Sequence, residues 1–366
     1  MSQLLRTTTV AAAALVVLVA TLDAGQPSSL KKGNPDLQSA GPLTFGPEGV
    51  LFIGDPQQAA LFAIDTGDTS GKPAPVNVQN LGEKVASLLG TDAKQIQIQD
   101  VAVNPASGKV YLSVSRGTGP DAQPVLLRVG SSGELEEVSL KDVPFAKTTF
   151  QNPPPDRPTG RRNRNQRRES ITDLAFRDGQ VIVAGLSNEE FASQLRAVPY
   201  PFTQDMQVAS VEVYHGNHGA FETRSPVRTF TFYEIGGEPH ILAAYTCTPL
   251  VKFPVSELKP GKKVRGTTVA ELGNRNRPLD MFIYQKDGKD FILMANSARG
   301  LMKISTEGLD REEGITQPVS DKAGQTYQTI EELQGVVELD RLDKQHAIVL
   351  QQTEDGRLNL KTVELP

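Results

Sequence analysis

The chain has 366 residues, of which 38% are hydrophobic and 6% aromatic, and it carries a formal net charge of −5. Its one cysteine excludes an internal disulfide, a multi-cysteine metal site and covalently attached haem. The absence of tryptophan argues against an enzyme that stacks a quinone cofactor on an indole ring. Aliphatic side chains must build most of the core, which suits sheets packed face to face.

The N-terminus resembles a secretory signal. Arg6 precedes an apolar run from Val10 to Leu22, which ends at Asp23-Ala24-Gly25. A positive charge followed by a short apolar run is typical of a signal peptide, and the run is shorter than a membrane span. We predict a signal peptide over residues 1–24 and therefore a secreted, periplasmic or cell-surface protein, with an uncleaved N-terminal anchor as the alternative.

The next segment, residues 25–40, is polar, and we expect it to be a leader that is available to close the ring described below. From residue 41 to residue 366 one theme occurs six times: an apolar strand, a turn, a second apolar strand and a third strand rich in Leu or Val. The first strands begin near residues 43, 101, 174, 230, 281 and 336. Repeats of this length with three or four strands each are typical of a β-propeller. We predict an all-β fold, a single six-bladed propeller domain, with seven blades as the alternative.

Two insertions fall in the third repeat. Residues 141–170 contain Pro153-Pro154-Pro155 and an arginine cluster, a composition that does not bury enough apolar surface to fold alone. Residues 187–207 begin with Ser187-Asn188-Glu189-Glu190, a capping-box sequence followed by apolar residues at helical spacing. We predict one short helix in this second insertion.

Propeller geometry places both insertions on one face. We call the four strands of a blade A to D, from the axis outward. The connection from strand B to strand C, and the connection from strand D to strand A of the next blade, then lie on the same face of the ring. Residues that precede strand A or end strand B also lie there. The candidate ligand-binding residues on this face are Asp55, Arg116, Cys247, Asn296 and Arg299.

Three acidic residues, Asp100, Asp173 and Asp280, stand at matching positions before strand A. Carboxylates are good ligands for Ca²⁺, and a metal-bound water can hydrolyse an ester or lactone. Alternatively, each short side chain accepts backbone N–H groups where its strand begins. We favour this structural interpretation and keep the metal site as the competing one.

Some repeats resemble those of six-bladed propellers of the NHL and gluconolactonase-like groups. The similar phrases are LTFGPEGVLFIGD at residues 43–55, PLVKF at 249–253 and GLMKI at 300–304. The resemblance implies the propeller fold for most of residues 40–365. For the gluconolactonase-like enzymes it also implies a divalent metal, usually calcium, held at the axis by Glu, Asn and Asp. Where those enzymes open their first inner strand with Glu, this chain has Gly41-Pro42.

The arginine cluster is the strongest local charge in an otherwise acidic chain. Guanidinium groups bind phosphate, sulfate and carboxylate through paired hydrogen bonds. The candidate anion- or partner-binding residues are Arg161, Arg162, Arg164, Arg167 and Arg168. Nucleic acid is disfavoured because no aromatic residues interleave with the arginines for base stacking. The alternatives are a solvated loop or a lid on the acidic face of the propeller.

Histidine and cysteine give weaker signals. The stretch His215-Gly216-Asn217-His218-Gly219 fits either a metal pair or a hairpin turn, because Asn and Gly adopt positive φ easily. We predict a turn between strands C and D, on the face opposite the aspartates. Cys247 is predicted to be a partly buried small side chain, with a nucleophile as the alternative.

Taken together, the sequence predicts a secreted propeller that acts as a binding or scaffold module through the face with the third-repeat insertions. Its expected partner is an extracytoplasmic protein, a glycan or an anionic surface. The alternative is a calcium-dependent lactonase or esterase-type hydrolase with a metal at the propeller axis. Ca²⁺ is the candidate cofactor, and no other is indicated.

Overall fold

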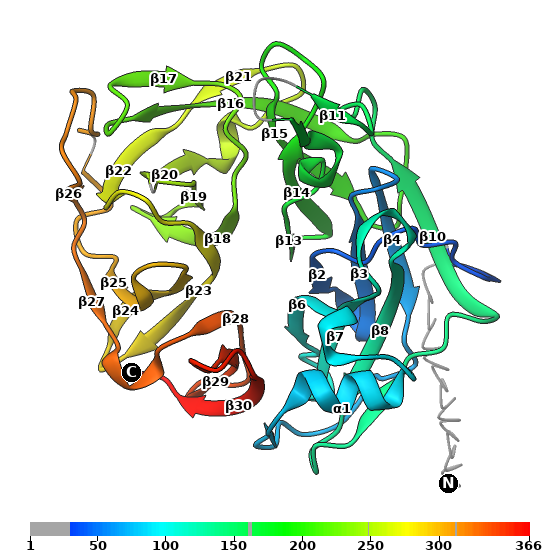
Figure 1. Cartoon of the computed structure of the whole chain (residues 1–366). Helices are drawn as coiled ribbons and strands as arrows, with labels where there is room; N and C mark the ends of the chain where they lie inside the picture. The colour runs from blue at the N-terminus through cyan, green and yellow to red at the C-terminus, as the bar shows by residue number, and fades with distance from the viewer. Residues whose placement is uncertain (1–29, 160–162, 248, 312) are drawn as a thin grey trace, which may run out of the picture.

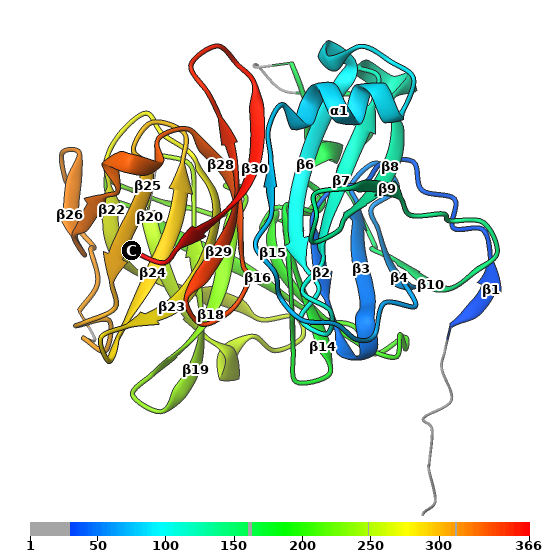
Figure 2. The ribbon, with the colours of Figure 1, turned by 90° about the horizontal axis from the view of Figure 1, so that it is seen from below.

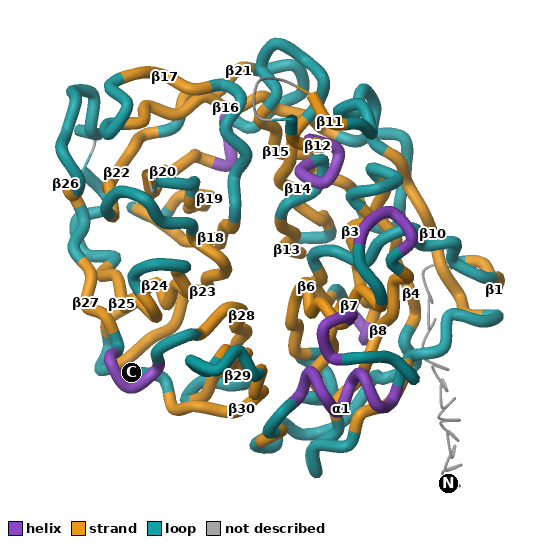
Figure 3. The backbone as a smooth tube through the Cα atoms, in the orientation of Figure 1, coloured by secondary structure: helices purple, strands orange, loops and turns teal. Residues whose placement is uncertain are grey.

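The computed structural model describes residues 30–159, 163–247, 249–311 and 313–366. The predicted signal peptide lies outside these residues. Strands dominate the described part of the chain and form six sheets of four or more strands around a central axis (Figures 1 and 3). The predicted all-β, six-bladed propeller is therefore confirmed. Within the same residues, no helix is long and apolar enough to cross a membrane.

Blades 1 to 3, numbered by the chain order of their inner strands, are antiparallel from the axis outward. Blade 1 comprises β2 (Leu43–Phe45), β3 (Val50–Asp55), β4 (Ala60–Asp65), β10 (Val143–Thr149) and β1 (Lys31–Gly33). Blade 2 comprises β6 (Ile96–Val103), β7 (Val110–Arg116), β8 (Gln123–Val129) and β9 (Leu135–Glu137). Blade 3 comprises β13 (Asp173–Arg177), β14 (Gln180–Leu186), β15 (Ser193–Pro199), β16 (Gln207–His215) and β17 (Ala220–Glu222), and β21 (Lys263–Arg265) adds parallel to β16.

Blades 4 to 6 follow the same plan. Blade 4 comprises β18 (Thr229–Ile235), β19 (Glu238–Ala244), β20 (Pro249–Pro254), β22 (Thr267–Leu272) and β26 (Lys322–Gly324). Blade 5 comprises β23 (Pro278–Lys286), β24 (Lys289–Asn296), β25 (Gly300–Ser305) and β27 (Tyr327–Thr329). Blade 6 comprises β28 (Val336–Arg341), β29 (His346–Gln352), β30 (Leu358–Glu364) and β5 (Asn77–Val78).

The blades do not follow one another around the ring in chain order. Neighbouring inner strands run β2, β6, β28, β23, β18, β13 and back to β2, so blade 2 lies between blades 6 and 1 (Figure 1). After β4 the chain leaves blade 1, adds β5 to the outer edge of blade 6, forms blade 2 and returns to blade 1 as β10. Blade 6 is thus completed by Asn77–Val78. The leader does not close the ring, because β1 pairs with β10 at the edge of blade 1.

The prediction of a helix within residues 187–207 is wrong. Strand β15 occupies the middle of this segment and pairs with β14 on one side and β16 on the other. The Ser187 hydroxyl accepts the Glu189 N–H, so the start of the capping pattern forms. Sheet pairing then overrides helical spacing, because Leu195 and Val198 are both buried between blades.

The one α-helix of the described residues, α1 (Leu81–Leu88), lies instead in the connection from β5 to β6. Its buried residues Leu81, Val85 and Ala86 pack against the cores of blades 2 and 6. In the side view, α1 lies beside β6 and β30 (Figure 2). The helix therefore fills the junction between two blades that are far apart in the sequence. Short 3₁₀ helices occur at η1 (Pro47–Gly49), η2 (Ala93–Gln95), η3 (Gly119–Asp121), η4 (Gln166–Glu169), η5 (Val255–Glu257) and η6 (Glu331–Leu333).

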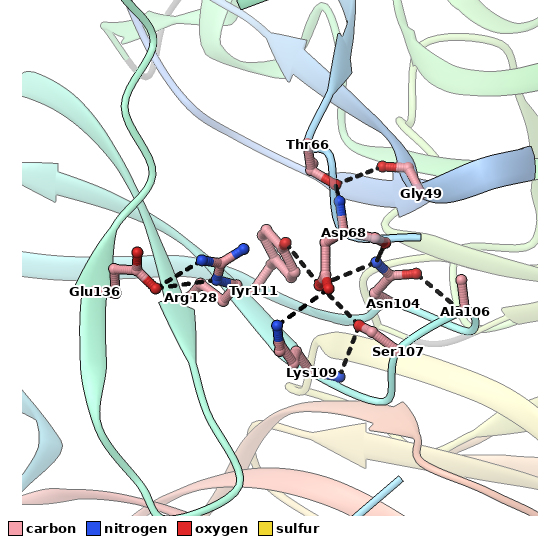
Figure 4. Close-up of polar contacts among 10 residues, drawn as sticks. All are labelled: Gly49, Thr66, Asp68, Asn104, Ala106, Ser107, Lys109, Tyr111, Arg128 and Glu136. Atoms are coloured by element: carbon pink, nitrogen blue, oxygen red, sulfur yellow. Dashed lines mark hydrogen bonds and ion pairs between the residues drawn. The ribbon is translucent and has the colours of Figure 1, made fainter. Parts of the chain in front are cut away.

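A buried carboxylate fixes the connection that leaves blade 1. Asp68 accepts hydrogen bonds from the Ser107 hydroxyl at 2.7 Å, the Tyr111 hydroxyl at 2.9 Å and Asn104 Nδ2 at 3.2 Å (Figure 4). Lys109 Nζ lies 3.1 Å from its Oδ1. Burial alone would raise the pKa of Asp68, but the bonds from Ser107, Lys109 and Tyr111 outweigh it and lower the pKa. These contacts join the chain to the first hairpin of blade 2 as it passes toward blade 6.

Replacing Asp68 should therefore destabilise the whole ring. We expect Asp68→Ala to cost about 3–5 kcal/mol of unfolding free energy, because it leaves buried donors and a lysine without their acceptor. Urea unfolding measures this cost. Asp65→Ala, which removes one exposed bond to the Gly67 N–H, is the control and should cost less than about 1 kcal/mol. Equal losses in the two variants would contradict the assignment.

Candidate functional site

Carboxylates of the inner strands gather at the axis. Asp100, Asp173 and Asp280 line a central channel of about 470 Å³, together with Asp340. Glu338 joins two of them, and single oxygen atoms of Asp100, Asp280 and Glu338 lie within 4.8 Å of one another. The side chains keep some exposure because they face the channel, although they lie deep in the molecule.

The aspartates connect neighbouring blades through the backbone. Each carboxylate accepts the N–H of the next residue with one oxygen and an N–H of the adjacent inner strand with the other. The inter-blade bonds run to Asp100 from Leu43 (2.6 Å), to Asp173 from Phe230 (2.7 Å), to Asp280 from Leu339 (3.1 Å) and to Asp340 from Val103 (2.6 Å). The bonds to the same carboxylates from Val101, Leu174, Met281 and Arg341 are each 2.7 Å. The structural interpretation of these aspartates is confirmed, and we call each such carboxylate an inter-blade latch.

Glu338 differs from the latches, and the sequence did not single it out. Within the described residues it makes no hydrogen bond through its side chain. It pairs with Leu350 just after a register shift in β28, as Asp100 and Asp280 each follow a shift in their own strands. Pattern counting missed Glu338, because the residue inserted before it breaks the alternation on which such counting relies.

Burial and mutual repulsion shift the pKa values of these carboxyl groups upward. Burial, the larger effect, raises the pKa of Asp173 to about 7 and that of Asp340 to about 6. Burial and the neighbouring negative charges raise the pKa values of Asp100, Asp280 and Glu338 well above their usual range. The cluster therefore holds protons more tightly than free carboxyl groups do, unless a cation replaces them.

The Asp173 shift predicts a pH dependence of stability. The Asp173 carboxyl group has a pKa of about 7 in the folded protein and 3.8 in the unfolded chain. The proton on Asp173 therefore stabilises the fold fully below pH 3.8. This stabilisation is lost as the pH rises toward 7, by up to about 1.4 kcal/mol per pH unit. Urea unfolding in chelator at several pH values should show the wild-type stability falling relative to Asp173→Asn from pH 4 to 7.

The exposed Asp205→Asn is the matched control for this series. Asp173→Asn also weakens a latch, so the absolute stabilities of wild type and variant differ at every pH. The informative quantity is how that difference changes with pH. A difference that stays constant, or that grows in favour of the wild type as the pH rises, would show that Asp173 is ionised in the folded protein.

A larger groove of about 1000 Å³ lies on the face where the inner strands begin. Its walls come from the segment between blades 1 and 3, from the β16–β17 hairpin with the residues after it, and from the end of β19. The residues that carry its chemistry are Arg164, Glu169, His215, His218, Glu222, Arg224, Arg228 and Cys247. The groove thus joins residues of both predicted insertions to the predicted binding face.

The predicted arginines have different environments. Arg164 lies in the groove and is exposed. Arg167 instead anchors its segment, because its Nε donates to the Pro154 carbonyl at 2.5 Å and its Nη1 to the Gln57 carbonyl at 3.1 Å. Arg168 lines a separate pocket. Arg161 and Arg162 lie outside the described residues.

The groove contains further arginines that the sequence did not single out. Arg228 forms an ion pair with Glu169 at 2.7 Å. Arg224 is exposed, and neither Arg164 nor Arg224 forms an ion pair within the described residues. Arg224 and Arg228 escaped notice because they are isolated along the chain and come together with Arg164 only through the fold.

Most other predicted binding residues have structural partners. Buried Asp55 accepts the N–H groups of Gln38 and Gln58 and the Ser39 hydroxyl. Asn296 accepts the Ala298 and Arg299 N–H groups. Arg299 donates to the Asn274 carbonyl. Arg116 is exposed at the end of β7. Among these five predicted residues, only Cys247 reaches the groove.

The His215–His218 turn lies on the groove face, so its predicted placement on the opposite face is wrong. The prediction counted β16 as a third strand, whereas β15 makes it the fourth, which ends on the other face. Glu222 Oε1 lies 3.2 Å from His215 Nδ1 and 2.6 Å from His218 Nδ1. Although burial opposes it, bonds from His215, Ser225 and His218 lower the pKa of Glu222 to about 2.

The pKa of Arg277 is affected by charged residues of both the groove and the channel. Burial lowers the pKa of Arg277, and the charges of Arg228 and Arg164 lower it further. Glu169 and Glu338 act in the opposite direction. Charged residues of the groove and of the channel thus both act on Arg277.

No protein-family model matches the chain, and the search of curated proteins finds no match. Among solved structures, the chain is similar to the full extracellular region of plexin A4, with 8% identity and a TM-score of 0.40 over 93% of this chain and 40% of that chain. It is similar to a PQQ-bound aldose sugar dehydrogenase from Streptomyces coelicolor, with 11% identity and a TM-score of 0.34 over 92% and 99% of the two chains. It is also similar to the α-L-arabinanase of Cellvibrio cellulosa, with 10% identity and a TM-score of 0.30 over 88% and 95%.

The chain spans about two fifths of the length of the plexin chain. Identities and TM-scores this low support no statement about activity, ligand or partner. Membership of the NHL or gluconolactonase-like groups is not confirmed by any family match.

Proposed function

We propose that this protein is a secreted propeller that binds an acidic glycan in the groove between blades 3 and 4. The observation that carries the proposal is the pair of exposed arginines, Arg164 and Arg224, that line a groove of about 1000 Å³. Guanidinium groups recognise carboxylate and sulfate through paired, charge-assisted hydrogen bonds. Secretion rests on the signal-like N-terminus.

The arginines around the groove also repel one another. The pKa of Arg277 is lowered by burial first and then by the positive charges of Arg228 and Arg164. A bound anion would relieve that repulsion, so part of the binding energy would come from charges already held in place. Arg228 is partly neutralised by Glu169, which leaves Arg164 and Arg224 as the main anion contacts.

An aromatic ring at the groove favours a sugar over a simple anion. Phe221 is 44% exposed and lines the groove. The Arg265 guanidinium lies 4.0 Å from its ring centroid, and Tyr214 packs edge-on at 5.1 Å, so the ring is held in position. An exposed, fixed aromatic surface gives a ligand ring a large contact at little entropic cost.

Replacing both free arginines tests this proposal. Arg164→Ala/Arg224→Ala should weaken binding of a fluorescent sulfated oligosaccharide more than tenfold, since each charge-assisted hydrogen bond contributes about 1.5–3 kcal/mol. Fluorescence anisotropy over a range of salt concentrations should show weaker binding at higher salt.

Arg116→Ala/Arg357→Ala makes the same charge change away from the groove and is the control. Equal loss of binding in both double variants would show that binding depends on the overall charge of the protein and not on the groove. A wild-type protein that binds no sulfated oligosaccharide, or that prefers an acidic peptide, would contradict the glycan assignment.

A calcium-dependent lactonase or esterase-type hydrolase is the second candidate. The observation that favours it is the approach of Glu338 to Asp100 and Asp280 at the axis, with ligand oxygens within 4.8 Å of one another. The latch oxygens retain a second lone pair, and Glu338 has no hydrogen bond among the described residues, so these three would hold the ion. A bound Ca²⁺ would supply Lewis-acid activation of a water molecule.

Replacing Glu338 tests the axial metal site without breaking an inter-blade latch. With EDTA as the reference, added Ca²⁺ should raise the melting temperature of the wild type, because an ion that binds only the folded state stabilises it by mass action. Glu338→Gln should lose this gain, while the exposed Glu332→Gln should retain it. Coincident melting curves with Ca²⁺ and EDTA for the wild type would exclude the axial metal.

A further inference from the structure

Three metal-ligating side chains meet at the β16–β17 hairpin. His215, His218 and Glu222 each offer a nitrogen or oxygen atom within 4.8 Å of the others. The Nδ1 atoms of both histidines face the same oxygen, Glu222 Oε1, at 3.2 and 2.6 Å. Ligands bound about 2.0–2.1 Å from one tetrahedral ion lie roughly 3.4 Å apart. The spacing is therefore close to that of a metal site, and the half-exposed His218 has room to adjust.

His215 is oriented as a ligand rather than as a surface residue. It is 2% exposed, and its buried Nε2 forms no hydrogen bond with the described residues. Burial lowers the pKa of His215, but the hydrogen bond and charge of Glu222 outweigh it and raise the pKa, with smaller contributions from Glu271 and the Cys247 backbone carbonyl. Metal-binding histidines usually direct their second nitrogen toward a carbonyl or carboxylate, which fixes the tautomer. A proton on Nε2 leaves the Nδ1 lone pair facing Glu222.

A buried carboxylate, that of Glu271, fixes the turn that carries His215 and His218. Glu271 accepts the Gly216 N–H at 2.6 Å with Oε1 and Asn217 Nδ2 at 2.9 Å with Oε2. Asn217 Oδ1 in turn accepts the Asp321 N–H at 2.9 Å. A Cβ at Gly216 would lie 2.7 Å from Val319 Cγ2, so the close packing requires glycine there. A ligand set on such a fixed turn is preorganised.

A hydrogen bond fixes Glu222. Its Oε2 accepts the Ser225 hydroxyl, which leaves Oε1 for the histidines. The remaining side of the three-residue cluster is open. His215, His218 and Glu222 all line the groove of about 1000 Å³. Two imidazoles and one carboxylate with an open position resemble catalytic zinc sites more than closed structural ones.

We propose that His215, His218 and Glu222 bind one divalent transition-metal ion of the zinc class, with its free coordination position facing the groove. Imidazole nitrogens select Zn²⁺, Co²⁺, Ni²⁺ or Cu²⁺ over Ca²⁺ and Mg²⁺, which prefer oxygen ligands. The site goes beyond the proposed glycan binding and does not depend on it, because the metal alone is the probe.

Titration of the metal-free full-length protein with Co²⁺ tests the site. The wild type should bind one equivalent and develop a visible d–d absorption band. His218→Ala and Glu222→Gln should weaken Co²⁺ binding more than about 100-fold, beyond the roughly 10–100-fold cost of losing an outer-shell partner. Zn²⁺ should displace Co²⁺ and raise the melting temperature of the wild type but not of His218→Ala.

His346→Ala is the matched control, because His346 and Asp343 form a second His–carboxylate pair at 3.0 Å that has no third ligand among the residues described. It should bind Co²⁺ like the wild type. The side chain of His218 is 53% exposed at a turn, so His218→Ala should fold normally, as circular dichroism would verify. A wild type without the absorption band, or equal binding by wild type, His218→Ala and Glu222→Gln, would overturn the proposal.

Discussion

The ring depends on a carboxylate that bridges two inner strands through their backbone N–H groups. Asp100, Asp173, Asp280 and Asp340 each place both oxygens in this role, at the junctions of blades 2 and 1, 3 and 4, 5 and 6, and 6 and 2. An inner strand at the axis exposes N–H groups that its own sheet does not satisfy, and burying them unpaired is costly. The latches satisfy them, and burial at the axis raises the pKa values of the latch carboxyl groups.

The arrangement of the blades determines where the groove forms. Neighbouring strands are antiparallel, so the second and fourth strands of a blade run toward the face on which its inner strand begins. Blade 3 ends its fourth strand there at His215, and blade 4 ends its second strand beside Cys247. The segment anchored by Arg167 crosses the same face and brings Arg164 to the groove. Rigid blades thus support a surface assembled from distant segments.

The sequence predicted the propeller because each blade repeats an apolar hairpin with its own turn, and it singled out three of the aspartates that line the channel. It did not predict that blade 2 lies between blades 6 and 1, since the strand responsible, Asn77–Val78, is too short to carry a pattern. Strand β15 was taken for a helix because apolar residues buried on both faces lack alternation. That error moved His215 and His218 to the wrong face. Glu338 was missed because a bulge shifts its strand by one residue.

The central claim is that the groove between blades 3 and 4 is the ligand-binding surface. Hydrogen–deuterium exchange of the full chain, with and without a sulfated oligosaccharide, tests it without any substitution. The account predicts slower exchange in residues 164–169, 215–228 and 246–247, which border the groove. Protection confined to the hairpin turns of the opposite face, at residues 178–179, 236–237 and 287–288, would contradict it.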